Sequence, residues 1–379
     1  MKKLILHACV LTILAFAIVS CAKEQNLINE QPIRQDIQNA LQQIQTVQKV
    51  DMDIKTRIAA KVIVVDEGSN NALAQALKDA GDGGIVYLRA GLHTETASVV
   101  ISSKVTLIGE TGAILRVKSL ASLMNLSNGV TEVYPAIHVL NASKTIVMNL
   151  EIQPIDKDGS TAILFENAPL CASVNCTIKS FMFSILIEKS NQMTVMDNKM
   201  TGSTLWQANP GLMAGVINTS GVGSWIANND IESAGVGIFL SDQKGNVVRN
   251  KVRKGRFGVI LCHVVPKALK LPNEHYTGGE FSTGDWQIIN NQSDDNLLIG
   301  FLIVDGSFNN TLEGNTTSGN GLYDIHLTMK GTKFAATPTT EASHDNIVKA
   351  NATQKVKDCG DRNIVTGVKL IDTATDPCN

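Results

Sequence analysis

Apolar residues recur along most of the chain in short runs that alternate with polar residues and end at glycine or asparagine. Such runs are typical of short β-strands joined by tight turns. One spacing recurs throughout, because a branched residue or a leucine stands three positions before an asparagine. The pairs are Ile146–Asn149, Val195–Asn198, Ile226–Asn229, Val247–Asn250, Ile288–Asn291, Leu312–Asn315 and Val348–Asn351. Where no insertion intervenes, about 21 to 24 residues separate successive asparagines.

A second pattern lies between these pairs, in which a small or turn-forming residue precedes an apolar-x-apolar triplet. It occurs as Ala136-Ile-His-Val, Gly237-Ile-Phe-Leu, Gly258-Val-Ile-Leu, Gly300-Phe-Leu-Ile and Asp324-Ile-His-Leu. A repeat of this length, made of short strands and polar turns, is the signature of a solenoid. Each turn of a parallel β-coil stacks about 4.8 Å above the last, so equivalent residues form columns. We predict an all-β parallel solenoid with aliphatic columns inside and a hydrogen-bonded asparagine column at one turn, where Asn tolerates a left-handed conformation.

A compact unit precedes the repeats. Two strands are predicted at 61–65 and 84–88, and a helix between them is predicted to begin at Ser69 or Asn70 and to end at Gly81. The sequence Ala72-Leu73-x-x-Ala76-Leu77-x-x-Ala80-Gly81-Asp82-Gly83-Gly84, followed by Val105-Thr-Leu-Ile-Gly109, resembles the N-terminal cap and first turns of the pectate-lyase-like superfamily. That resemblance implies a right-handed parallel β-helix whose open end is plugged by the helix.

The first residues indicate export. Lys2 and Lys3 precede an apolar run from Leu4 to Val19 that is too short for a permanent membrane span and has the order of a secretory signal. The run ends in Ile18-Val19-Ser20-Cys21, which resembles the lipobox of bacterial lipoproteins and implies cleavage before a lipidated Cys21. The alternative is an ordinary signal peptide in which Cys21 is incidental. We predict an outer-membrane lipoprotein on the periplasmic or cell-surface face, with the membrane as its partner.

Three regions follow from these patterns: a signal peptide at 1–20, a stalk at 21–60 and the β-helix domain at 61–379. The stalk is rich in glutamine, and Ile33, Ile37, Leu41 and Ile44 recur at helical spacing, so part of it is predicted to form an amphipathic helix or to be disordered. A net charge of −2 without a basic tail gives no reason to expect nucleic acid as a partner.

Five cysteines follow Cys21, and in an exported chain they can be oxidised. The local pairs Cys171–Cys176 and Cys359–Cys378 are plausible disulfides, which would leave Cys262 alone in an apolar strand. Neither a Cys-x-x-Cys spacing nor an accompanying histidine pair is present, so no metal site and no cofactor are predicted.

Residues three and four positions after the repeated asparagines carry most of the candidate chemistry. Glu232, Arg253 and Asp294 occupy the first of these positions on three consecutive turns, and Lys254 and Asp295 occupy the next. Carboxyl groups so placed could act as general acid and base, with Arg253 binding an acidic sugar. Adjacent like charges favour Asp294 or Asp295 for proton transfer. The alternative is a surface ladder of ion pairs.

Two insertions, 262–285 and 330–345, interrupt the repeat at the same corner, which is where a rigid solenoid usually carries its functional loops. The first contains His275 and Tyr276, and Trp286 follows it. Together with the basic residues Lys254 and Arg256, these aromatic residues are candidates for a saccharide-binding platform. The alternative is a loop whose aromatic residues cover its own base. His138 and His326, at the middle of their triplets, are predicted to point outward into solvent.

These features predict a protein that binds a polysaccharide and, if it is an enzyme, cleaves it as a lyase or a glycoside hydrolase. The adjacent Asp294 and Asp295 are similar to the paired aspartates of polygalacturonases, although the other motifs of that family are missing. A non-catalytic surface or protein-interaction role is the alternative. A third possibility is an accessory protein resembling the β-helical maturation protein of nitrous-oxide reductase, but the Met, His and Cys clusters that favour copper transfer are missing.

Overall fold

The computed structural model describes a large part of one compact unit, Lys55–Asn379. The described residues are 61–120, 124–125, 130–203, 214–232, 234–262, 264–265, 269–273, 279–280, 283–331, 333–334, 337–338, 341–371 and 378. The predicted signal peptide, Cys21 and the stalk therefore lie outside the described residues. Among those described, no helix has the length and apolar character needed to span a membrane.

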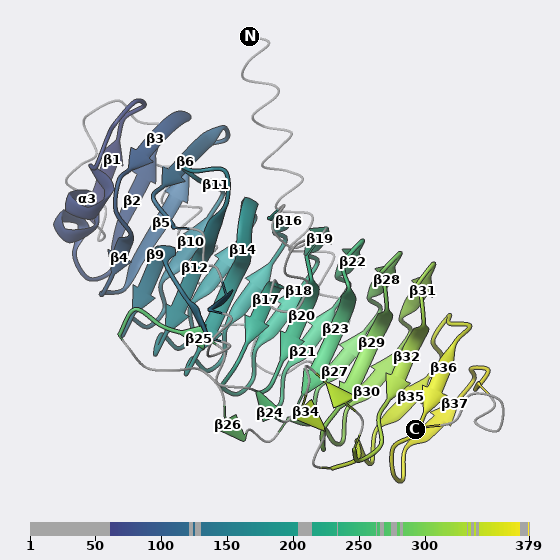
Figure 1. The fold of residues 1–379 in the computed structure, drawn as a ribbon. Helices are drawn as coiled ribbons and strands as arrows, with labels where there is room; N and C mark the ends of the chain where they lie inside the picture. Colours follow the sequence, from purple (N-terminus) through teal and green to yellow (C-terminus); the bar gives the residue numbers. More distant parts are fainter. Residues whose placement is uncertain are drawn as a thin grey trace. The chain divides into compact units, whose positions relative to one another are not determined.

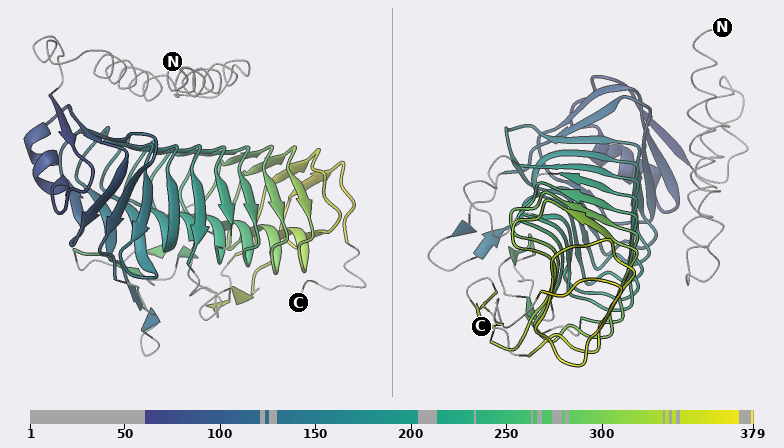
Figure 2. Two further views of the ribbon diagram at one scale, coloured as in Figure 1. Left: turned by 90° about the horizontal axis from the view of Figure 1, so that it is seen from above. Right: turned by 90° about the vertical axis from the view of Figure 1, so that its right-hand side faces the viewer.

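Two parallel sheets run along the coil, whose turns stack in a row (Figures 1 and 2). Sheet 1 contains one short strand from each turn. Its strands are β1 (Val62–Val65), β2 (Gly84–Leu88), β5 (Val105–Gly109), β10 (Ile146–Met148), β13 (Ala172–Val174), β15 (Thr194–Met196), β18 (Trp225–Ala227), β21 (Asn246–Val248), β27 (Gln287–Ile289), β30 (Thr311–Glu313), β35 (Ile347–Lys349) and β37 (Ile364–Thr366).

Sheet 2 bends, so that most turns contribute to it twice. Its first series is β3 (Gly91–Glu95), β6 (Ala113–Val117), β11 (Glu151–Pro154), the start of β14 (Thr177–Glu188), β16 (Lys199–Gly202), β19 (Asp230–Glu232), β22 (Lys251–Arg253), β28 (Gln292–Asp294) and β31 (Thr316–Ser318). Its second series is β4 (Val99–Ile101), β9 (Pro135–Leu140), β12 (Gly159–Glu166), the end of β14, β17 (Ala214–Asn218), β20 (Val236–Leu240), β23 (Phe257–Cys262), β29 (Ile299–Val304), β32 (Tyr323–Leu327) and β36 (Val356–Asp358).

Strand register confirms the predicted interior column. Ile226 pairs with Val247, Val247 with Ile288, and Ile288 with Leu312. All four side chains are fully buried in the core that fills the coil. A parallel β-helix with aliphatic columns inside is therefore the architecture of this domain, as the repeat predicts.

The asparagine column is also confirmed and runs through six turns. The backbone N–H and the Nδ2 of Asn250 both donate to Oδ1 of Asn291, at 2.9 and 3.0 Å. The same pair of bonds recurs from Asn198 to Asn351, so each buried amide satisfies the one before it. The left-handed residue is, however, the one before each ladder asparagine, such as Arg249 (φ 54°).

The first repeated pair was assigned to the wrong column. Val147, and not Ile146, pairs with Leu107 and Ser173 in the interior column. Asn149 is accordingly the left-handed residue of its turn (φ 56°), and Leu150 takes the buried position that follows. All three residues of β10 are apolar, so alternation could not fix the register there.

The predicted N-terminal capping helix is present, but the hydrogen bond at its first turn differs from the predicted one. Helix α3 (Leu73–Ala80) buries Leu73 and Leu77 in the coil's core, and Gly81 with φ 69° ends it. Neither Ser69 nor Asn70 caps the helix, because its N-cap is Ala72. Instead, the Leu73 N–H donates to Glu95 Oε1 at 2.8 Å, so β3 of the first turn supplies the acceptor.

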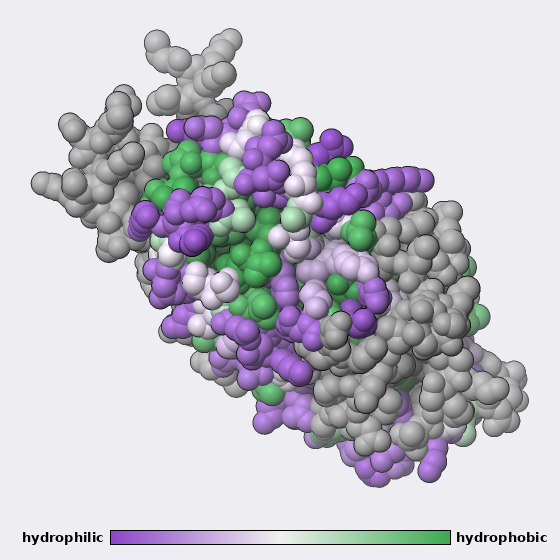
Figure 3. Space-filling model, turned by 60° about the vertical axis from the view of Figure 1, so that its left-hand side comes forward, coloured by the Kyte–Doolittle hydropathy of each residue, from purple (hydrophilic) through white to green (hydrophobic). Residues whose placement is uncertain are grey.

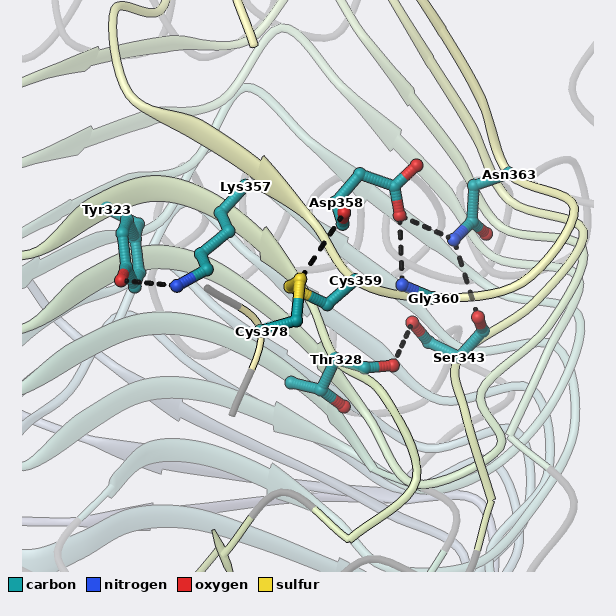
Figure 4. Close-up of a disulfide and its surroundings, with 9 residues drawn as sticks. All are labelled: Tyr323, Thr328, Ser343, Lys357, Asp358, Cys359, Gly360, Asn363 and Cys378. Carbon is teal, nitrogen blue, oxygen red and sulfur yellow. Dashed lines mark hydrogen bonds between the residues drawn. A yellow bond between two sulfur atoms is a disulfide. The ribbon is translucent and has the colours of Figure 1, made fainter. Parts of the chain in front are cut away.

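A disulfide fastens the last turn. Cys359 is bonded to Cys378, as predicted, and lies beside β36 (Figure 4). The second predicted disulfide is wrong, since Cys171 and Cys176 are both free and buried. Each is an interior residue of the coil, where its thiol donates to a backbone carbonyl oxygen.

Both predicted insertions leave the coil between the second series of sheet 2 and sheet 1. Residues 262–285 join β23 to β27 and contain β24 (Val264–Val265), β25 (Leu269–Lys270) and β26 (Gly279–Glu280). Residues 330–345 precede β35 and contain the pair β33 (Lys333–Phe334) and β34 (Thr337–Pro338). A third insertion, unforeseen in the sequence, lies between β6 and β9 and holds β7 (Met124–Asn125) and β8 (Val130–Glu132).

Candidate functional site

The predicted charged column forms on the first series of sheet 2. Glu232 pairs in register with Arg253, and Arg253 with Asp294. Arg253 donates to both Asp230 and Glu232, the latter at 2.8 Å, and Lys254 Nζ donates to Glu232 at 2.7 Å. The stacking is therefore as predicted, and its side chains are engaged with one another.

These ion pairs bear on the proposed chemistry. The hydrogen bond from Lys254, followed by the contact with Arg253, lowers the pKa of Glu232, whereas a general acid needs a raised value. Asp294 accepts from Ser318 Oγ at 2.9 Å and from Gln292, and Asp295 is exposed with φ 53°. The contacts favour the surface ion-pair ladder that was the alternative interpretation.

The predicted saccharide-binding platform lies only partly within the described residues, and the position of Trp286 excludes that residue from it. Trp286 is fully buried in the coil's core, and its Nε1 donates to the Asp242 carbonyl oxygen at 2.8 Å. It therefore cannot stack on a ligand. His275 and Tyr276 lie outside the described residues. Arg256 is half-buried and lies over the Phe257 ring, 5.6 Å from its centroid.

The described centre of the 262–285 insertion, residues 269–273, crosses the outward face of the second series; we call it the strap. Leu269 and Leu271 are buried in a second apolar cluster with Leu164 and Leu186. Because Ile163 and Phe165 point into the coil, the intervening Leu164 points outward. Strand β25 also pairs with β8, so the strap reaches the third insertion and not the charged column.

A buried polar cluster lies at one end of this outward face. His138 Nε2 lies 2.7 Å from Glu166 Oε2, with both side chains 5% exposed. Asn273 of the strap donates to the other oxygen, Glu166 Oε1, at 2.8 Å. The predicted solvent exposure of His138 is therefore wrong, because the carboxyl and the strap cover it. His326 is half-buried and packs against the Tyr323 ring at 4.9 Å.

Glu188 is the second carboxyl of this cluster. It pairs in register with Glu166 on the next turn and is 2% exposed. The Thr219 hydroxyl contacts its Oε2. Burial raises the pKa of Glu188, the Thr219 hydrogen bond and Lys189 oppose the shift, and the charge of Glu166 adds to it. Two neighbouring carboxyls thus have unequal surroundings.

Hydrogen-bond donors surround both carboxyls of this cluster. Thr219 Oγ1 lies 3.0 Å from the Ile187 carbonyl oxygen as well as against Glu188. The Thr219 hydroxyl donates to Glu188, and the Ile187 carbonyl oxygen also accepts from the Thr219 backbone N–H at 3.0 Å. Both oxygens of Glu166 have partners that can donate, which is what a buried carboxylate requires.

Sequence reasoning missed Glu166 and Glu188, although a signal was present. The segments Ala162-Ile-Leu-Phe-Glu166 and Ser184-Ile-Leu-Ile-Glu188 repeat the same pattern 22 residues apart. Counting from the asparagines overlooks them, because they lie in a different part of the turn. Apolar residues also reach the surface near this end, where Val100, in register with His138, is 48% exposed. Figure 3 shows one face of the molecule, on which apolar residues gather between polar ones.

Comparisons with known proteins agree with the fold. Residues 94–264 match the family described as Periplasmic copper-binding protein (NosD). The chain is also similar to a family 28 exopolygalacturonase from Yersinia enterocolitica, with a TM-score of 0.54 and 13% identity, covering 83% of this chain and 69% of that one. An alginate lyase from Paenibacillus gives 0.52 and 13%, covering 82% and 97%. An endo-xylogalacturonan hydrolase from Aspergillus tubingensis gives 0.50 and 9%, covering 82% and 91%.

No curated protein matches the chain. Structural likeness at such identities shows that the protein is a right-handed parallel β-helix, and its chemistry has to be argued from its own residues.

Copper binding, which the matching family's description names, does not fit the described donors. Thiolates are the ligands that favour Cu(I). Burial raises the pKa of Cys171 to about 12 and that of Cys176 to about 11, so both remain thiols inside the coil. Within the described ranges, no three His, Cys, Asp or Glu side chains are grouped so that they could hold a metal ion.

Proposed function

We propose that this chain is an exported β-helix protein that binds a polysaccharide and hydrolyses its glycosidic bonds. The observation that carries the proposal is the pair of buried carboxyls, Glu166 and Glu188, in register on adjacent turns with unequal surroundings. Glycoside hydrolysis needs two such groups, one ionised and one able to give up a proton. The three similar structures carry the names of polysaccharide-cleaving enzymes, which supports this class of substrate.

In this proposal, the residues around the two carboxyls are positioning residues. His138 and Asn273 hold Glu166, and Thr219 holds Glu188. The strap covers the cluster in the structure, so a ligand reaches the carboxyls after the Asn273–Glu166 hydrogen bond opens. The column of Glu232, Arg253 and Asp294 is the competing site that the sequence suggests, and experiment separates the two.

The test compares matched glutamine variants of the mature protein on a panel of acidic and neutral polysaccharides, with reducing ends and affinity followed together. Glu188→Gln should lower turnover about 10²- to 10⁴-fold, the usual effect of losing a general acid. Binding should persist, since the amide keeps the side chain's shape. Glu232→Gln, in an outward carboxylate of the ion-pair ladder, is the control and should leave turnover unchanged.

A reversed result, with Glu232→Gln inactive and Glu188→Gln unaffected, would move the site to the charged column. A non-catalytic accessory role is the second candidate, and the strap over the cluster favours it, because Glu166 is already held by Asn273. In that case the panel shows binding without reducing ends or unsaturated products for any variant.

The location is part of the proposal. We infer that Cys21 is lipidated after cleavage at Ser20–Cys21 and anchors the protein to the outer membrane, because the preceding residues resemble a lipobox. The matching family is described as periplasmic, which agrees with export. Intact-mass analysis of the membrane fraction should find a lipidated N-terminal Cys21, and Cys21→Ser should release the protein. Cys9→Ser, within the signal, is the matched control; an unlipidated wild-type N-terminus contradicts the anchor.

A further inference from the structure

We propose that the chain hydrolyses its glycoside with retention of anomeric configuration, through a covalent glycosyl intermediate on Glu166, with Glu188 as the acid and base. The inference rests on the proposed function and specifies its reaction. The substrate class is a glycoside whose ring is held against the outward face of β12 and β14.

The spacing of the two carboxyls is set by the coil. Glu166 and Glu188 are direct partners across β12 and β14, and both follow an interior residue, so both point outward. Neighbouring strands lie about 4.8 Å apart. Retaining enzymes hold their carboxyls about 5–5.5 Å apart, whereas inverting enzymes need about 6.5–9.5 Å to admit a water molecule between the sugar and the base. Adjacent turns therefore suit direct attack by one carboxylate.

The surroundings assign the two roles. Glu166 has partners on both oxygens, His138 at 2.7 Å and Asn273 at 2.8 Å, which favour its ionised form as a nucleophile. Glu188 is buried in register beside Glu166, and burial raises its pKa, which suits a proton donor. Burial of both carboxyls on a face otherwise lined by Leu164 and Leu186 is costly for stability, and such costs are typical of functional positions.

The reaction balances over two steps. A Glu166 oxygen bonds to the anomeric carbon as the bond to the leaving oxygen breaks, and that oxygen takes the Glu188 proton with the electron pair. Water then attacks the anomeric carbon and gives a proton back to Glu188. The bond to Glu166 breaks with its electron pair returning to the carboxylate. Opening of the Asn273 contact frees the Glu166 oxygen that attacks.

The wild-type protein gives the first test. A p-nitrophenyl glycoside of a sugar hydrolysed in the panel is followed by proton NMR, and the first product anomer should match the substrate. A 2-deoxy-2-fluoro glycoside with a dinitrophenyl leaving group should inactivate the protein, and mass spectrometry should find the added sugar on the peptide containing Glu166.

Variants give the second test, with azide as an external nucleophile. Glu188→Gln should lose turnover of the oligosaccharide but still release dinitrophenol, which leaves without a proton, and azide should give a glycosyl azide of retained configuration. Glu166→Gln should release dinitrophenol only with azide, giving the inverted azide. Glu232→Gln should behave as wild type. Circular dichroism checks that each variant is folded.

The outcomes separate the two proposals. Hydrolysis with an inverted first product, or with a label on any residue other than Glu166, overturns the retaining mechanism and leaves the proposed hydrolysis standing. An unsaturated product comes from elimination and overturns both proposals. Absence of cleavage of every probe overturns the proposed hydrolysis itself, and the retaining mechanism with it.

Discussion

At the scale of single residues, one buried polar pair shows how hydrogen bonding and protonation accommodate polar groups in this domain. Asn218 and Asp242 are both buried, and Asn218 Nδ2 donates to Asp242 Oδ2 at 2.7 Å. Their remaining oxygens, both Oδ1 atoms, have no hydrogen-bond partner. Burial raises the pKa of Asp242 well above its usual value. A protonated Asp242 has a hydrogen to donate, whereas a carboxylate would leave two acceptors unsatisfied in the core.

Replacing Asp242 with asparagine should stabilise the protein at neutral pH. Because the pKa of Asp242 is raised in the folded state, its contribution to stability is present below its unfolded value near 3.8 and is lost as pH rises from there through its folded value. The loss is about 1.4 kcal/mol for each unit of pKa shift. Urea unfolding should therefore show Asp242→Asn more stable than wild type at pH 7 and not at pH 3.

The control for this prediction is an exposed carboxyl of the same chain. Asp295→Asn should leave the difference between pH 3 and pH 7 as in wild type, because Asp295 lies at the surface. An Asp242→Asn variant that is less stable than wild type at pH 7 contradicts a protonated Asp242.

At the scale of elements, the asparagine ladder joins successive turns. Asn250 accepts from the backbone and side chain of Asn229 and donates to Asn291, so one amide serves three turns. Its Nδ2 also donates to the Ile226 carbonyl oxygen at 2.8 Å. The ladder thus satisfies buried backbone groups at a turn where no strand pairing is available.

Truncating the centre of the ladder should be strongly destabilising. Asn250→Ala leaves the Asn229 backbone N–H and side chain without their acceptor, and each unsatisfied buried group costs about 1–3 kcal/mol. Urea unfolding should show a loss of about 3 kcal/mol or more. Gln292→Ala, exposed on the next turn, should change stability by less than about 0.5 kcal/mol. Equal effects from both substitutions would show that the ladder contributes little.

At the scale of the whole domain, contacts between segments that are distant in sequence support parts of the coil that the stacking of turns does not. Strand β25 of the strap pairs with β8, where Lys270 contacts Glu132, 138 residues earlier in the sequence. At the far end, the disulfide ties Cys378 to the turn after β36 (Figure 4). Turns of a solenoid contact only their neighbours, so its last turn lacks support on one side. The disulfide supplies a covalent link there.

Removing that link should loosen the last turn before the rest of the coil. The disulfide closes a loop of 19 residues, for which the chain-entropy estimate is about 3 kcal/mol. In Cys359→Ser/Cys378→Ser, hydrogen exchange should accelerate in β36 and β37 while β18 and β21 stay protected. Cys262→Ser, at a buried cysteine outside this disulfide, is the control. Uniform acceleration along the coil would contradict a local role.

Some features follow from the sequence alone. The interior column of Ile226, Val247, Ile288 and Leu312 and the ladder from Asn198 to Asn351 are readable, because a repeated turn places the same chemistry at the same position each time. The stacking of Glu232, Arg253 and Asp294 follows from the same counting. Where every residue of a strand is apolar, as in β10, the register is not encoded locally.

Tertiary structure alone decided what covers the outward face. An outward residue such as His138 is solvated unless another segment crosses it, and the segment that does so is more than a hundred residues away in the sequence. The same crossing brings Asn273 against Glu166, the partner of Glu188 on the adjacent turn. Periodicity reports which side of a strand a residue occupies, and it carries no information about a distant loop. The repeat places Glu166 and Glu188 one above the other, but their burial is decided only in the folded molecule.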